Sequence, residues 1–180
     1  MILVMFLLLA LALVPLSGGS LRRLGELRFR APVLLWLALA AQLALIAVPG
    51  PRTWWRVALN LALYPLGLAF VWLNRHVPGL WVVGLGALCN LLPILANGGV
   101  MPASAAAMRA AGLRAEPGLF ANSAVLEHPR LLFLGDVIAI PRSWPFANVL
   151  SVGDVLIALG AAVVLHRASG SRLLGRRRSS

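Results

Sequence analysis

Residues 149–166 read VLSVGDVLIALGAAVVLH. The run contains one acidic residue, Asp154, close to its start, and almost all its other residues are apolar or small. An α-helix rises about 1.5 Å per residue, so about 20 apolar residues cross the roughly 30 Å hydrocarbon core of a bilayer, with about 17 as the lower limit. The run therefore predicts a membrane-spanning helix.

Four stretches on the N-terminal side have the same character: 1–16, 32–48, 54–73 and 79–96. The whole chain of 180 residues is 61% apolar and 12% charged, with a mean hydropathy of +0.90. These values are typical of membrane proteins. We therefore predict an all-α integral membrane protein, a single membrane domain over 1–180 with five transmembrane helices.

The arginines indicate the orientation of these helices. The chain has sixteen basic residues, all arginine, and five acids, and LRRLGELRFR (residues 21–30) follows the first apolar stretch directly. Because positive residues favour the cytoplasmic side, we expect the N-terminus outside and both this loop and the Arg-rich tail 167–180 inside. The predicted location is therefore a membrane that the chain crosses several times.

The same composition limits partners and cofactors. No basic face or aromatic platform lies outside the predicted spans, so we expect membrane lipids or another membrane protein as partners, and no nucleic acid. Cys89 is the single cysteine. One chain can therefore form neither a disulfide nor a thiolate metal cage, and we expect no cofactor.

A segment of about 52 residues, 97–148, separates the last two predicted spans on the outer side. Loops of that length are uncommon unless they are functional or disordered, and this one is rich in apolar residues. Pro102 can begin a short helix that continues to Ala111. The run 131–140, LLFLGDVIAI, is too short to span, so it is re-entrant, interfacial, or an extended piece on the end of the bundle. We expect a structured outer cap.

Two acids within Gly-Asp-aliphatic-aliphatic sequences, Asp136 and Asp154, are the candidate catalytic residues. A carboxylate among aliphatic side chains is costly unless it is paired, hydrogen-bonded or protonated. If the two meet, they share a proton, as an acid–base dyad requires. The alternative is structural: Asp154 caps the last helix, and Asp136 pairs with Arg130 or Arg142.

Several amides and one histidine are secondary candidates. Asn60 and Asn90 lie at a similar expected depth to Asp154 and could line a polar pocket that opens outward. The alternative is that Asn60, Asn90 and Gln42 form interhelical hydrogen bonds. Asn97 is either a helix C-cap or a substrate-binding amide. His128 could bind a metal ion together with Glu127, Asp136 and Asp154, but no ligand spacing supports a metal site. His76 and His166, at the inner boundary, are expected as interfacial anchors.

Three short sequences are similar to those of a known family: ANGGVMP (96–102), FLGDVI (133–138) and SVGDVLIALG (151–160). His128 lies between the first two, and Pro141 follows the second. Together they resemble a family of uncharacterised bacterial multi-pass membrane proteins, a domain of unknown function. The resemblance covers residues of about 86 to 160 and implies no activity. It implies the bacterial cytoplasmic membrane as the location.

A second, more distant resemblance is to lipoprotein signal peptidase. Gly153-Asp154 with Ile157 and Gly160 is similar to the final motif of that enzyme, and Asp136 stands in the place of its partner aspartate. The resemblance implies that both aspartates are catalytic, with Asn90 matching an asparagine of the enzyme. The chain departs from the enzyme at 150–151, Leu-Ser in place of Phe-Asn, and at 93–94, Pro-Ile in place of Asp-Arg.

Two functional hypotheses follow. The favoured one is a non-catalytic bundle, either a subunit of a membrane complex or an amphiphile-binding protein. The alternative is an outer-leaflet hydrolase with Asp136 and Asp154 as shared acid and base and with Asn90, Asn97 or His128 in contact with the substrate.

Overall fold

The computed structural model describes residues 2–48, 51, 53–113, 123–144 and 146–173. Glu116 and the end of the Arg-rich tail lie outside these ranges. The elements, in chain order, are α1 (Ile2–Leu16), α2 (Leu21–Gly25), α3 (Pro32–Ala47), α4 (Trp54–Leu73), α5 (Leu80–Ala96), β1 (Met101–Pro102), α6 (Ala105–Ala110), β2 (Ser123–Ala124), the 3₁₀ turn η1 (Leu132–Leu134), β3 (Asp136–Ile140), β4 (Asn148–Ser151) and α7 (Val152–Ala168).

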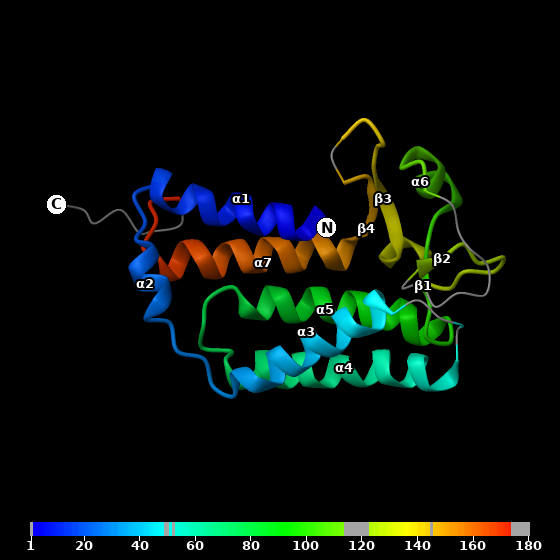
Figure 1. Cartoon of the computed structure of the whole chain (residues 1–180), viewed down its shortest axis with the longest axis horizontal. Coiled ribbons are helices and arrows are strands. Elements are labelled where there is room, and N and C mark those ends of the chain that lie inside the picture. Colours follow the sequence, from blue (N-terminus) through cyan, green and yellow to red (C-terminus); the bar gives the residue numbers. More distant parts are fainter. Residues whose placement is uncertain (1, 49–50, 52, 114–122, 145, 174–180) are drawn as a thin grey trace.

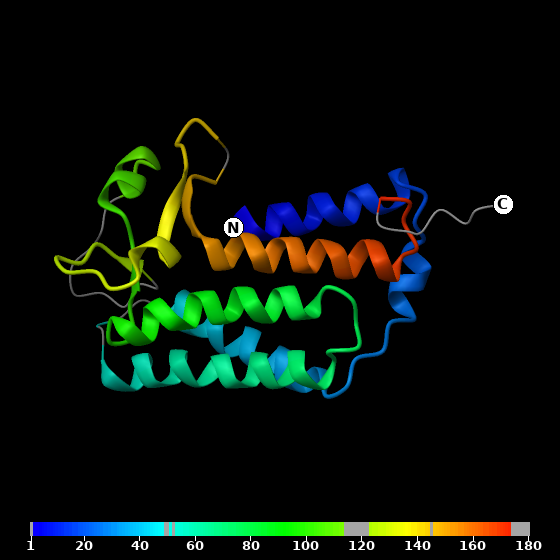
Figure 2. The ribbon, with the colours of Figure 1, turned by 180° about the vertical axis from the view of Figure 1, so that it is seen from behind.

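The five long helices, α1, α3, α4, α5 and α7, run along the long axis of the molecule (Figure 1). All the short strands and α6 gather at one end, and we call the described residues between α5 and α7 the cap. At the opposite end lie α2, the α4–α5 loop and the C-terminal end of α7, and the reverse view shows the same separation (Figure 2). We call this the basic end. The five long helices begin and end within three residues of the ranges expected from the sequence.

Glycines let α5 and α7 pack with their backbones in contact. A Cβ atom added at Gly86 would lie 2.6 Å from the carbonyl oxygen of Gly153, and one at Gly160 would lie 2.7 Å from the backbone nitrogen of Val83. At the basic end, a Cβ at Gly79 would lie 2.7 Å from the carbonyl oxygen of Gly160. Small residues permit this close approach between helices in membranes. The α5–α7 contact holds the start of α7 firmly against α5.

The prediction of five transmembrane helices is not supported by helix length. Among the described residues, α4 is the helix long and apolar enough to cross a bilayer, with 20 residues and a mean hydropathy of 1.5. The others are shorter: α5 and α7 have 17 residues each, which span about 26 Å against a hydrocarbon core of about 30 Å. Sequence hydropathy overestimated the spans because apolar runs continue through turns and strands, as at 149–151.

The cap corrects the prediction of an all-α fold. Strand β1 pairs in parallel with β2, and β3 pairs antiparallel with β4. The predicted helix from Pro102 begins instead at Ala105, because Pro102 belongs to β1 and the Ser104 side chain accepts a hydrogen bond from the backbone N–H of Ala107. The run 131–140 forms η1 and β3. Of the alternatives given for it, the extended piece is the one observed.

Buried polar side chains order the loops of the basic end. Asn74 is fully buried, donates hydrogen bonds to the carbonyl oxygens of Arg30 and Phe70, and accepts one from the backbone N–H of Arg30. His166 is also buried and hydrogen-bonds to Ser171, which is itself inaccessible. The expectation that His166 is an interfacial anchor is therefore wrong: its ring fixes the C-terminal turn after α7. His76 is exposed.

Candidate functional site

Strand register brings the two Gly-Asp sequences to the same place. Asp136 is the first residue of β3 and stands opposite Ser151, the last residue of β4, with an irregularity in the register before Ile138. Because α7 begins directly after Ser151, Asp154 lies in the first turn of that helix. Asp136 and Asp154 are 18 residues apart in the sequence, but the β3–β4 pairing and the first turn of α7 bring them close together.

Asp154 belongs to a closed hydrogen-bond network at the start of α7. Its Oδ2 accepts from the backbone N–H of Ser151 at 3.1 Å, and the Ser151 hydroxyl accepts from the backbone N–H of Asp154 at 2.9 Å. This reciprocal pair is a capping box. The structural alternative stated for Asp154, a helix cap, is the geometry observed.

Asn90 extends this network across the α5–α7 contact. Its Nδ2 donates to Asp154 Oδ1 at 2.9 Å, and its Oδ1 accepts from the Ser151 hydroxyl at 2.7 Å. A Cβ atom at Gly153 would overlap the Asn90 side chain, so glycine leaves the space that the amide occupies. Asn90 therefore acts as the interhelical hydrogen-bonding residue that was one of its two predicted roles.

Asp136 is buried beneath the cap. Its backbone carbonyl oxygen accepts from the Ser104 N–H at 2.9 Å, and its carboxyl group hydrogen-bonds with Ser123 of β2. Burial raises the pKa of Asp136 from the usual 3.8 to about 6; the Ser123 hydrogen bond opposes this shift and the charge of Asp154 adds to it. No ion pair links Asp136 to Arg130 or Arg142, all of which the structure describes, so that predicted pairing is wrong.

Both carboxyl groups interact electrostatically with each other and with the Tyr64 side chain of α4. Asn60, one helical turn before Tyr64, is buried as well. The site therefore draws on α4, α5, α7 and β3. Sequence reasoning missed Ser151, although the Ser-x-x-Asp spacing of a capping box was a signal for it. No pattern pointed to Tyr64 or Ser123, because their places depend on packing between distant segments.

Among the described residues, neither Asn97 nor His128 forms a hydrogen bond to the residues of the Asp154 network. Asn97 is the C-cap residue of α5; its Nδ2 donates to the carbonyl oxygens of Pro93 and Arg130, and its Oδ1 accepts from the Arg130 N–H. The amide thus fixes the chain before η1, in keeping with the C-cap alternative. His128 is exposed on the cap. Within the described ranges, no group of three His, Cys, Asp or Glu side chains could hold a metal ion.

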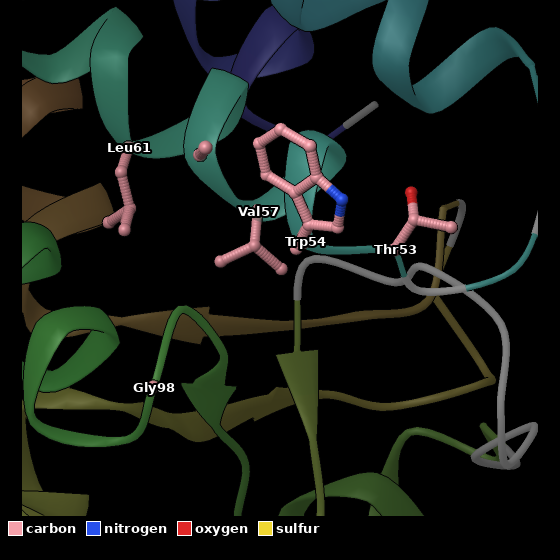
Figure 3. Close-up of a pocket in the computed structure, with 6 residues that line it drawn as sticks. Thr53, Trp54, Val57, Leu61 and Gly98 are labelled. Atoms are coloured by element: carbon pink, nitrogen blue, oxygen red, sulfur yellow. The ribbon is translucent and has the colours of Figure 1, made fainter.

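Sequence reasoning also missed a cavity at the cap end of α4 (Figure 3). The cavity has a volume of about 440 Å³, within the range of small-molecule sites, and is lined by Thr53, Trp54, Val57, Ala58, Leu61 and Gly98. Side chains of α4 form one wall, and the turn after α5 lies opposite (Figure 3). The Thr53 hydroxyl is buried and has no hydrogen-bond partner in the structure. The lining is thus mostly apolar.

The fold and site define a helical bundle closed at one end by a small mixed cap. Residues 26–166 match the family described as "Family of unknown function (DUF5317)", and the protein belongs to this family. This confirms the expected resemblance to a family of unknown function. Over 110 residues the chain is 30% identical to an uncharacterized protein of Thermotoga maritima; the match covers 61% of this chain and 63% of that relative, so less than two thirds of the relative is spanned. No solved structure matches.

Proposed function

We propose that this protein is a multi-pass membrane protein of the bacterial cytoplasmic membrane that binds an amphiphile at its cap end without transforming it. The observation that carries the proposal is the apolar cavity beside α4. A ligand with an acyl chain would place it against Val57 and Leu61.

Exposed apolar side chains support a membrane location for more helices than α4. On α1 and α3, large apolar residues stand on the surface: Leu8, Leu9 and Leu16, then Trp36, Leu37 and Leu43. A water-soluble domain rarely exposes apolar surface on this scale. Helices of 15 to 17 residues can be accommodated if the bilayer thins locally and flanking residues extend to the interface. Five embedded helices, with the cap outside, remain our proposal.

The closed network around Asp154 favours binding over catalysis. Both of its carboxylate oxygens accept hydrogen bonds, and the Asn90 amide is engaged at both ends. Asn97 is likewise engaged by Pro93 and Arg130. These amides would have to break existing bonds in order to orient a substrate. A non-catalytic role, alone or as a subunit beside another membrane protein, needs no such change.

A second candidate, an outer-leaflet hydrolase of peptide or lipid-linked substrates, is favoured by the raised pKa of Asp136 beside Asp154. A pKa of about 6 makes Asp136 an effective proton donor near neutral pH. In such a reaction water would attack a carbonyl carbon and give its proton to Asp154. Asp136 would protonate the carbonyl oxygen to give a tetrahedral intermediate. As the C–N bond breaks, Asp154 would pass the proton taken from water to the leaving nitrogen, and Asp136 would recover its proton from a hydroxyl of the intermediate.

Binding in the cavity can be tested with a matched pair of α4 variants. Ala58→Leu fills the cavity, whereas Ala62→Leu adds the same bulk one turn along the helix, outside the lining. The probe is lysophosphatidylcholine with a brominated acyl chain, which quenches nearby tryptophans, and Trp54 lines the site. We expect A58L to weaken saturable quenching about tenfold, because the added atoms displace the acyl chain. A62L should bind like the wild type.

Equal weakening by both variants, or quenching that never saturates, would overturn the binding proposal. Trp54→Phe should remove the saturable quenching and Trp55→Phe should keep it, since Trp55 does not line the cavity. The hydrolase is tested separately. Loss of product release from lipid-linked peptides in both Asp136→Asn and Asp154→Asn, with probe binding retained, would favour catalysis.

A further inference from the structure

A second pocket lies at the basic end, between the α2–α3 loop, the α4–α5 loop and the C-terminal end of α7. Its volume is about 310 Å³. Val77 and Val164 contribute apolar wall, and Val77 is buried in the core cluster with Phe70 and Leu80. A wall anchored in the core gives the pocket a fixed shape.

Three basic side chains line the same pocket: Arg28 from the α2–α3 loop, His76 from the α4–α5 loop and Arg167 from α7. All three are exposed residues. Among the acids that the structure describes, Glu26 is the one at this end, and it pairs with Arg22 at 3.5 Å. Among the described residues, neither Arg28 nor Arg167 has a carboxylate partner. The pocket therefore presents uncompensated positive charge.

Tryptophans on either side of the α4–α5 loop indicate the depth of this pocket. Trp72 is 67% exposed at the end of α4 and Trp81 is 63% exposed at the start of α5. The Arg75 guanidinium stacks on the Trp72 ring at 4.7 Å. Exposed tryptophans beside arginines are typical of the headgroup level of a membrane. The basic rim then faces headgroups and the apolar wall faces acyl chains.

We propose that this pocket binds the phosphate headgroup of an anionic phospholipid of the inner leaflet. The planar guanidinium groups of Arg28 and Arg167 match phosphate oxygens by paired hydrogen bonds, and His76 adds a third donor. The apolar wall at Val77 and Val164 receives the upper part of an acyl chain. Basic pockets between helices are a known form of lipid recognition on the cytoplasmic side. The site is at the opposite end from the α4 cavity; it rests on the proposed membrane location and orientation, and not on binding in that cavity.

The test is lipid retention by the full chain, purified in detergent and measured by native mass spectrometry with dioleoyl phosphatidylglycerol or dioleoyl phosphatidylcholine added. We expect wild-type protein to prefer the anionic lipid. The double variant R28Q/R167Q should weaken that binding at least about tenfold, since each substitution removes a charged donor. Arg22→Gln is the matched control, because its side chain is 91% exposed and lies outside the pocket. It should stay within about twofold of the wild type.

Equal retention of both lipids by the wild type would overturn the proposal, and so would an equal loss in R22Q. Inorganic phosphate distinguishes the source of the ligand. If phosphate alone binds the wild type as tightly as the lipid, in a manner that R28Q/R167Q abolishes, the site serves a free anion and the lipid proposal fails. Unfolding temperature without added lipid checks the fold; these exposed side chains should leave it nearly unchanged.

Discussion

The cap and the basic end of this bundle hold polar groups under different constraints. At the cap, Asp136 and Asp154 are embedded among Ser151, Asn90 and Ser123, and their partners are supplied by other parts of the chain. At the basic end, Arg28 and Arg167 line an open pocket without a carboxylate partner among the described residues. Because unpartnered charge is tolerated only where solvent or headgroups reach it, the carboxyl groups of the cap are held within the fold, whereas the arginines of the basic end stand where a ligand can reach them.

The largest effect is expected in a test of whether the cap and the basic end lie on opposite sides of the membrane, because each position is either labelled or not labelled. In a Cys89→Ser background, Ser143→Cys reports on the cap and Leu21→Cys on the basic end; both positions are exposed. In right-side-out vesicles, an impermeant maleimide should label the cysteine at position 143 and should label that at 21 only after permeabilisation. Labelling of both, or the reverse pattern, would remove the assignment of the two ends to opposite sides.

The next largest effect is expected at the α5–α7 contact that supports the cap network. Gly153→Ala should lower the free energy of unfolding by about 3 kcal/mol, because the new methyl group overlaps the Asn90 side chain. Gly67→Ala is the control, since a Cβ there meets nothing within 4 Å and should stabilise the helix slightly. Unfolding in mixed micelles measures both. A neutral G153A would show that the Asn90 network contributes little to stability.

A smaller, pH-dependent effect is expected at Asp136. Its folded-state pKa of about 6 exceeds the usual 3.8, so the protonated form stabilises the fold at low pH, and this contribution is lost as the pH rises from 3.8 through 6. Wild-type stability relative to Asp136→Asn should therefore fall by about 2 kcal/mol across that window. Glu127→Gln, at an exposed acid of the cap, controls for the loss of one negative charge. Parallel curves for the wild type and D136N would contradict the burial of this carboxyl group.

Much of the architecture could be predicted from local sequence. Apolar runs located the long helices, since hydropathy and helical rise act over consecutive residues. The length of segment 97–148 and the short apolar run 131–140 indicated a structured cap at one end of the bundle. The Ser-x-x-Asp sequence at 151–154 encoded the capping box, although the prediction concentrated on Asp154 alone.

The partners of these residues were decided by tertiary structure. The meeting of Asp136 with Ser151 depends on the β3–β4 register, and the Asn90 bonds depend on the close α5–α7 crossing that Gly86 and Gly153 permit. Both are contacts between segments far apart in the chain, which no local period specifies. Composition and hydropathy therefore determined where the helices and charges lie, whereas register and backbone packing decided which polar groups meet and which pockets remain open.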